Sequence, residues 1–385
     1  MNATEILQQL VAVSTPSSVS NLPLLHWVRD YLQPLGWHLE WMKWTDENGM
    51  LKANLLAFAG PHANAIDVAP IDLAFVCHTD TVPYAASWQA ALALEERDGQ
   101  LHGCGSCDVK GALACFLAAI GSVDAGRLQQ RIAMILTADE EIGCKGMERL
   151  LASERYGKMR IHFAIVSEPT SLRLGIAGKG YGLARITVHG SEAHSAFPAQ
   201  GASAITTAAQ LITQIEAAFH VEPVASDSYS RELRTLFDPP RTTVNIGVIH
   251  GGTAKNIVAG ECSFLVEWRP IPGEKHGAVQ TMLSEICRSA EQVHGAVRID
   301  VEALRDEPGF APAASGDLQQ QLQYLLSTAS TGISFGSEAS RLARIADEVI
   351  VIGPGDMRTA HSERECVPIA ELEDWTRALR DLIQM

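Results

Sequence analysis

A histidine and an aspartate stand two residues apart directly after a short apolar segment. The segment, residues 71–77, predicts a buried strand, and His78 and Asp80 follow its end. The imidazole of His78 could bind a transition metal through one nitrogen. The carboxylate of Asp80 could accept the N–H of the other nitrogen and so fix the tautomer. Taken alone, such a pair is more typical of a polar strand end with a structural histidine, so the metal hypothesis depends on the rest of the chain.

Further acids and a second histidine follow other predicted elements. With the first histidine, the candidates are His78, Asp108, Glu140, Glu141, Glu168 and His361. Two imidazoles with several carboxylates suit Zn, Mn or Co, and a carboxylate can bridge two ions. Because Glu140 and Glu141 are adjacent, we expect their side chains to point in different directions. One of them could then bind a metal while the other remains free as a base.

Short apolar segments alternate with helical segments through much of the chain. Strands are expected at 71–77, 132–138, 161–166 and 348–352, and an amphipathic helix at 110–123. This alternation predicts an α/β fold with a mostly parallel sheet and helices on both faces. In such sheets, binding sites form beyond the carboxyl ends of the strands. The candidate acids and histidines stand at or shortly after these ends.

A different pattern occupies residues 175–302. It predicts strand, helix, strand, strand, helix and strand, which is the order of a ferredoxin-like α+β domain. Residues 220–241, with three prolines and mixed charge, are expected to form a long loop on this domain. A chain of 385 residues is also long for a single core. We therefore expect a catalytic metal-binding domain at 1–174 and 303–385, interrupted by an inserted ferredoxin-like domain.

Composition and charge disfavour several classes of protein. The chain has 45 acidic and 30 basic residues, a formal net charge of −15. That charge disfavours nucleic acid and anionic membranes as partners. No apolar run approaches the roughly 18 residues that span a membrane. The first residues lack the pattern of a secretory signal, so a cytoplasmic location is expected.

The eight cysteines are too few for a disulfide framework in a chain of this length. Cys104 and Cys107 form a C-x-x-C motif, but no second Cys or His pair follows at the spacing of a structural zinc site. Flanking glycine and aspartate favour a loop of a functional site over a redox motif.

Together the motifs resemble the M20 metallopeptidase family of co-catalytic zinc amidohydrolases. Within it they are most similar to the branch of acetylornithine deacetylases and succinyl-diaminopimelate desuccinylases. The resemblance covers essentially the whole chain. Its motifs are His78-Thr-Asp-Thr-Val-Pro83, Gly103-Cys-Gly-Ser-Cys-Asp-Val-Lys-Gly111, Thr137-Ala-Asp-Glu-Glu141, Ser167-Glu-Pro-Thr170, the stretch 190–201, Gly251-Gly-Thr-Ala-Lys-Asn256, and Gly353-Pro-Gly-Asp356 with His361.

This resemblance implies two divalent metal ions, with Zn²⁺ favoured and Co²⁺ or Mn²⁺ as alternatives. Asp108 would bridge both ions. His78 and Glu168 would complete the site of one ion, and Glu141 and His361 the site of the other.

The resemblance also implies the catalytic groups. Asp80 would orient His78, and Glu140 would be the general base. His194, on the insert of a partner subunit, would help to stabilise the oxyanion. The family therefore implies a homodimer formed through the insert, which would also act as a lid that closes over the substrate.

Substrate contacts are implied less directly. Arg269 resembles a carboxylate-binding arginine of the family, for which a bidentate guanidinium is well suited, although a surface ion pair is the alternative. Lys179, Asn256, Gly336 and Ser337 fall in substrate-contacting stretches of the family.

The expected activity is removal of an acyl group from an N-acyl amino acid, a small molecule with a linear amide. The first candidate is conversion of N-acetylornithine to ornithine and acetate in arginine biosynthesis. Succinyl-diaminopimelate desuccinylase and deacetylases of acetylcitrulline or acetyllysine are the alternatives. A non-catalytic metal-binding protein of the same fold is a further alternative, and it predicts lost ligands, whereas all are present here.

Overall fold

The computed structural model describes residues 1–65, 69–121, 123–220 and 228–385, and it divides into two compact units. The larger unit comprises Met1–Ile176, Pro312–Thr331 and Ser337–Met385. The other unit, called the insert below, comprises Ala177–Ala311 with Gly332–Gly336. None of the helices in the described part of the chain combines the length and the hydrophobicity that spanning a membrane requires.

The larger unit is built on an eight-stranded sheet with the order β1-β2-β6-β3-β7-β14-β8-β13. Its strands are β1 (His38–Thr45), β2 (Leu51–Ala59), β3 (Ile71–His78), β6 (Ile132–Thr137), β7 (Ile161–Val166), β8 (Leu174–Gly178), β13 (Ser330–Ile333) and β14 (Ala346–Val351). The central strands β6, β3, β7 and β14 are parallel, whereas β1, β2 and β8 pair antiparallel. The central strands are almost continuously buried, as expected for strands covered on both faces.

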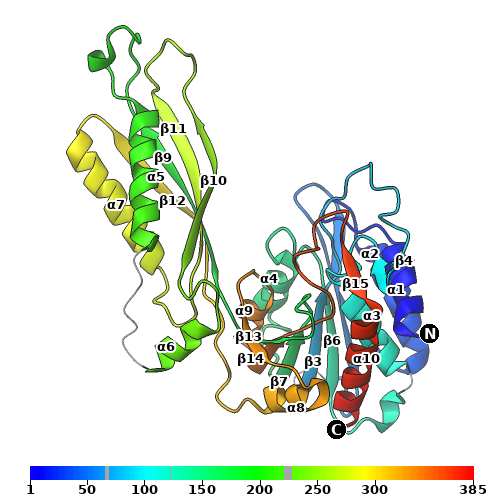
Figure 1. The fold of residues 1–385 in the computed structure, drawn as a ribbon. Helices are drawn as coiled ribbons and strands as arrows, with labels where there is room; N and C mark the ends of the chain where they lie inside the picture. Colours follow the sequence, from blue (N-terminus) through cyan, green and yellow to red (C-terminus); the bar gives the residue numbers. More distant parts are fainter. Residues whose placement is uncertain (66–68, 122, 221–227) are drawn as a thin grey trace. The chain divides into compact units, whose positions relative to one another are not determined.

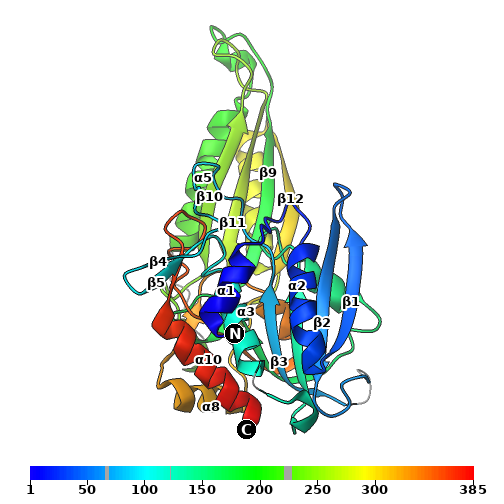
Figure 2. The ribbon, with the colours of Figure 1, turned by 90° about the vertical axis from the view of Figure 1, so that its right-hand side faces the viewer.

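Helices cover this sheet on both sides. They are α1 (Ala3–Val11), α2 (Leu22–Leu32), α3 (Lys110–Ile120), α4 (Lys145–Ala152), α8 (Asp317–Leu326), α9 (Ala339–Leu342) and α10 (Ile369–Gln384). Helices α1, α3 and α10 contact one another and lie side by side in both views (Figures 1 and 2), whereas α4 and α9 pack together on the other side of the sheet. Every residue of α3 is buried, because this helix lies between the sheet and its two neighbours.

The remaining elements of the larger unit are small. A three-stranded sheet has the order β15-β5-β4, with β4 at Glu95–Arg97, β5 at Gln100–His102 and β15 at Cys366–Pro368. Single 3₁₀ turns lie at Gln33–Leu35 and Ala125–Arg127. The small sheet joins the segment after residue 361 to the segment that leads into the loop before α3.

The insert has a four-stranded antiparallel sheet with the order β10-β11-β9-β12. Its elements are β9 (Tyr181–His189), a 3₁₀ turn at Pro198–Gln200, α5 (Ala204–His220), α6 (Ser228–Thr235), β10 (Thr243–Gly251), β11 (Glu261–Arg269), α7 (Ala278–His294) and β12 (Arg298–Glu307). One face of the sheet packs on α5 and α7 around a core that includes Ile186, Leu211, Phe264 and Leu283 (Figure 1).

The prediction of a mostly parallel sheet with a ferredoxin-like insert is confirmed by these two sheets. Two details differ. The insert extends to residue 311 rather than 302, because β12 continues to Glu307. The loop expected at 220–241 contains α6, whose short and polar sequence lacks a long apolar stripe; residues 221–227 of that range lie outside the described residues.

Candidate metal centre

The candidate ligands lie at one edge of the large sheet because the central strands are parallel and in register. His78 ends β3 and is paired with Thr137, the last residue of β6. On the other side, Val76 is paired with Val166, the last residue of β7. The residues after these three strands therefore start from the same edge, as the sequence pattern predicts.

The first group of potential ligands contains His78, Asp108 and Glu168. All three are buried, and each offers an atom that lies within 4.8 Å of the others. The Nε2 atom of His78 lies 3.1 Å from Oδ1 of Asp108.

The second group contains Asp108, Glu141 and His361, again with ligand atoms within 4.8 Å of one another. The Nε2 atom of His361 lies 3.2 Å from Oδ2 of Asp108 and 3.2 Å from Glu141. Asp108 is thus common to both groups, and its two oxygens face different imidazoles. This is the position that a carboxylate bridging two ions would occupy.

The electrostatics of the two groups favour added positive charge. Burial raises the pKa of Glu168, and the nearby charge of Asp108 raises it further. Burial also raises the pKa of Asp108, but hydrogen bonds with His361 and His78 outweigh this and hold it below its usual value. Hydrogen bonds with Asp108 and Glu141 raise the pKa of His361 to about 10.

The donor set fits divalent transition metals. Each group offers one imidazole nitrogen and carboxylate oxygens, the combination that Zn²⁺, Co²⁺ and Mn²⁺ accept. Buried carboxylates at this spacing are costly unless a cation is present. Neither group includes a cysteine, so among the described residues Cys104 and Cys107 take no part in these groups.

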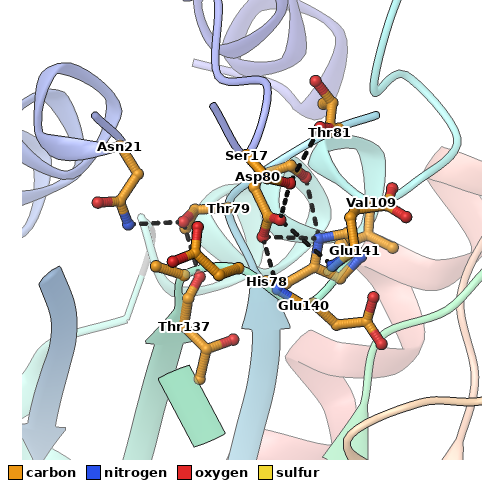
Figure 3. A network of polar contacts seen from close by, with 12 residues as sticks. Ser17, Asn21, His78, Thr79, Asp80, Thr81, Val109, Thr137, Glu140 and Glu141 are labelled. Carbon is orange, nitrogen blue, oxygen red and sulfur yellow. Dashed lines mark hydrogen bonds and ion pairs between the residues drawn. The ribbon is translucent and has the colours of Figure 1, made fainter. Parts of the chain in front are cut away.

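Asp80 contacts His78, but through its backbone oxygen and not through the carboxylate that the sequence suggested. The Nδ1 atom of His78 is 3.0 Å from the backbone oxygen of Asp80, whereas the carboxylate oxygen Oδ1 is 3.8 Å away. The carboxylate instead accepts hydrogen bonds from the backbone N–H groups of Glu140 (3.0 Å) and Glu141 (3.2 Å) and from the hydroxyl of Ser17 (2.6 Å), as Figure 3 shows. Asp80 therefore orients His78 through its backbone and orients the two glutamates through its side chain.

Glu140 does not belong to either ligand group. Its Oε1 accepts a hydrogen bond from the thiol of Cys144, with an Sγ–Oε1 distance of 3.3 Å. The backbone N–H groups of Gly143 and Cys144 both donate to the backbone oxygen of Glu140. Burial is the main cause that raises the pKa of Glu140 to about 8. The charge of His78 lowers this pKa, whereas the charge of Glu141 raises it further. A carboxyl with a raised pKa beside the ligand groups has the properties of a general acid–base group.

Two buried contacts of Lys52 support this centre. The buried ammonium of Lys52, on β2, lies 2.7 Å from Asp139 and 2.6 Å from the backbone oxygen of Ser17. It thus joins the loop after β6 to the turn that contributes the Ser17 hydroxyl to Asp80. Lys52 lies in a strand with no motif around it, so no sequence pattern indicates this role.

On the insert, the structure brings His194 and Asn256 into neighbouring segments. His194 forms an isolated β-bridge with Ile257, and the N–H of Ser195 donates to the backbone oxygen of Asn256. The Nδ1 atom of His194 accepts the N–H of Ala196 at 3.1 Å, which leaves the proton on Nε2 of the exposed ring. His194 is therefore available as a hydrogen-bond donor.

Arg269 and Gly336 also lie together within the insert. The guanidinium of Arg269 stacks on Tyr181, with 4.4 Å to the ring centroid, and bonds to Glu267 at 2.9 Å. A Cβ atom on Gly336 would lie 3.2 Å from Nη1 of Arg269, so a glycine leaves room for the guanidinium.

The other two expected substrate residues have structural contacts. Lys179 is buried and donates to the backbone oxygens of Pro239 and Arg241, at 3.1 and 2.7 Å. Ser337, in the larger unit, accepts the N–H of Ala339 at the start of α9. The ammonium of Lys179 thus forms its hydrogen bonds within the insert.

The sequence model that describes peptidase family M20/M25/M40 matches residues 74–385 of this chain. The chain therefore belongs to this family of metallohydrolases. Among curated relatives, the acetylornithine deacetylase of Myxococcus xanthus is 38% identical over 366 residues, which are 95% of this chain and 92% of that protein. The acetylornithine deacetylase of Proteus mirabilis is 28% identical over 390 residues, or 99% and 95% of the two chains.

Solved structures share the fold over the whole chain. A tripeptidase from Staphylococcus aureus superimposes with a TM-score of 0.77 at 20% identity, covering 100% of this chain and 97% of that one. A dinuclear metal-binding peptidase of the M20 family from Bacillus subtilis superimposes with a TM-score of 0.69 at 13% identity, covering 99% and 96%. At these identities the likeness shows the fold alone.

Proposed function

We propose that the protein is a deacetylase that hydrolyses N-acetylornithine to ornithine and acetate in arginine biosynthesis. The observation that supports the chemistry most strongly is the pair of ligand groups sharing Asp108, with Glu140 beside them and outside both. The relatives named acetylornithine deacetylase support the choice of substrate.

The ligand assignment in this proposal follows the two groups. His78, Asp108 and Glu168 would hold one divalent ion, and Asp108, Glu141 and His361 the other, with Zn²⁺ as the first candidate. Bound there, such ions polarise an amide carbonyl and lower the pKa of a water molecule.

Glu140 supplies the proton transfers. Its carboxylate takes a proton from the water that attacks the amide carbon, and it returns this proton to the nitrogen as the C–N bond breaks. Oε1 is engaged by Cys144, so Oε2 is the oxygen available for this transfer. Asp80 holds the backbone of Glu140 in place throughout.

In this proposal, residues of the insert bind the substrate. Arg269, stacked on Tyr181 beside Gly336, binds the α-carboxylate, and Asn256 assists. His194, reaching in on the insert of the partner subunit of the proposed dimer, would donate from Nε2 to the oxyanion. We do not carry Lys179 forward as a substrate ligand, because its ammonium already bonds to two backbone oxygens of the insert.

The assembly in this proposal is a homodimer formed through the insert. Strand β10 lies at an edge of its sheet, where Val248 and Ile249 are 42% and 50% exposed. An edge strand with exposed β-branched residues is suited to pairing with a second copy.

Substrate specificity is tested by measuring amine release from four substrates by the zinc-loaded protein. N-Acetylornithine should be turned over with the highest kcat/KM, ahead of N-acetylcitrulline, N-acetyllysine and N-succinyl-diaminopimelate. Preference for the succinyl substrate would replace the proposed activity with a desuccinylase. Two bound ions with no turnover of any of these four substrates would leave the metal centre standing and move the search to dipeptides and other N-acyl amino acids.

A further inference from the structure

A buried carboxylate outside the ligand groups contacts the loop that contains Asp108. Glu365 is 2% exposed, and its Oε2 accepts the backbone N–H of Gly105 at 3.0 Å. Its Oε1 accepts the N–H groups of Cys107 at 3.1 Å and of Asp108 itself at 3.0 Å. Within the described residues, these three N–H groups have no other acceptor.

These hydrogen bonds connect two segments far apart in the sequence. Glu365 lies four residues after His361, whereas the loop it contacts leads to Asp108 and then to α3. The small sheet continues this connection, because Cys366 on β15 pairs with His102 on β5. One ligand of the second group therefore lies on each of the two connected segments.

A second contact joins the same segments. The thiol of Cys107 lies 3.6 Å from the backbone oxygen of Asp356 and close to the hydroxyl of Thr359. A Cβ atom on Gly355 would lie 2.6 Å from this sulfur, so the two segments pack closely. The Cys107 side chain is thus a packing group against the segment that leads to His361.

We propose that Glu365 is a positioning residue that sets the geometry of the second metal site, formed by Asp108, Glu141 and His361. The inference rests on the proposed function, which assigns these residues as ligands. The carboxylate holds the backbone of Asp108 at a fixed distance from the segment of His361. The contact between Nε2 of His361 and Oδ2 of Asp108 depends directly on that distance.

The first group depends less on Glu365. His78 ends strand β3, and Glu168 follows the end of β7, so the large sheet places both residues. Loss of the Glu365 carboxylate would leave three buried N–H groups unpaired and would let the loop move away from the segment of His361. The second ion should therefore be weakened more than the first.

The test is a Zn²⁺ titration of the metal-free protein by calorimetry, with metal per chain measured after dialysis. In Glu365→Gln, an NH₂ group replaces one acceptor oxygen and faces an N–H donor. The second ion should then bind roughly 10- to 100-fold more weakly, the range for outer partners of metal ligands, while the first ion binds nearly as in the wild type. Glu365→Asp keeps both oxygens on a shorter side chain, so it should bind the second ion more tightly than Glu365→Gln does. If Glu365→Gln does not fold, Glu365→Asp takes its place in the titration.

Glu348→Gln is the matched control. Glu348 is equally buried and also accepts backbone N–H groups, those of Leu318 and Gln319 at 2.9 and 2.8 Å, but it lies on β14 away from the ligand groups. If Glu365 contributed only to stability, Glu365→Gln and Glu348→Gln would both have a lower Tm, and each would still bind two ions.

The inference is overturned if Glu365→Gln binds both ions with wild-type affinities, or if both ions weaken equally. A wild-type chain that binds fewer than two ions would instead contradict the proposed metal centre itself.

Discussion

Asp108 presents its two carboxylate oxygens to different imidazoles, Oδ1 to His78 and Oδ2 to His361. The sequence could predict the residue types of this centre, because acids and histidines after apolar strands are visible in a single chain. It could not show which oxygen faces which nitrogen. Nor could it show that the Asp80 carboxylate bonds to the backbone of Glu140 and Glu141, because those hydrogen bonds depend on the loop conformation.

At the residue scale, Glu140→Gln separates proton transfer from metal binding. Because Glu140 lies outside both ligand groups, the variant should still bind two ions, while kcat falls by roughly 10²- to 10⁴-fold through loss of the general base. Metal per chain and kcat should be measured on the same preparation. Glu141→Gln is the control and should lose affinity for one ion. Near-wild-type kcat in metal-loaded Glu140→Gln would refute the base assignment.

The buried pair of Lys52 and Asp139 gives a second prediction at this scale. Lys52→Met leaves Asp139 without its ammonium partner in a buried position, so the free energy of unfolding should fall by about 3–5 kcal/mol. Removing the charge of Asp139 as well, in Lys52→Met/Asp139→Asn, should cost less than the single change; asparagine suits the positive φ of 58° at this position. Urea denaturation measures both variants. Equal losses in the single and double variants would show that the charge of Asp139 is not what destabilises the protein.

At the scale of elements, the central strands were predictable because strands buried on both faces give continuous apolar runs. The insert was predictable from its strand and helix order. Helix α6 was not, because eight mostly polar residues have no periodic apolar stripe. The end of β12 was also placed too early, since the partly exposed second half of that strand carries charged residues typical of a loop.

Lys179 gives a pH-dependent prediction for the insert. Burial lowers the pKa of Lys179 to about 8, whereas an unfolded lysine titrates near 10.4. Between these values, unfolding takes up a proton, so this residue makes the free energy of unfolding rise with pH. Lys179→Met lacks this contribution. The stability advantage of the wild type over Lys179→Met should therefore be larger at pH 9.5 than at pH 7.5, as measured by urea midpoints. An advantage that does not change with pH would mean that the lysine pKa is not lowered by folding.

At the scale of the whole molecule, the membership of the family and the presence of two units agree with the sequence-based expectation. The dimer interface is harder to predict from the sequence, because an edge strand can be identified only once the strand order is known. Here that order places β10 at an edge, with Val248 and Ile249 exposed.

The proposed dimer makes a direct prediction. Ile249→Asp places a charge on the exposed edge strand, so it should shift the protein from dimer to monomer in sedimentation velocity experiments. Val293→Asp is the control, because Val293 is 80% exposed near the end of α7, a helix that contacts β12 at the opposite edge of the sheet. A wild-type chain that sediments as a monomer, or a dimer unaffected by Ile249→Asp, would contradict an interface through β10.

The most direct test of the central proposal is ornithine release from N-acetylornithine by the protein loaded with Zn²⁺, compared with the same protein after chelation. Two ions per chain, turnover of the loaded form, and loss of turnover on chelation with recovery on metal addition are the predicted results. Turnover that persists after both ions have been removed would contradict the account, since neither ligand group would then be needed for the reaction.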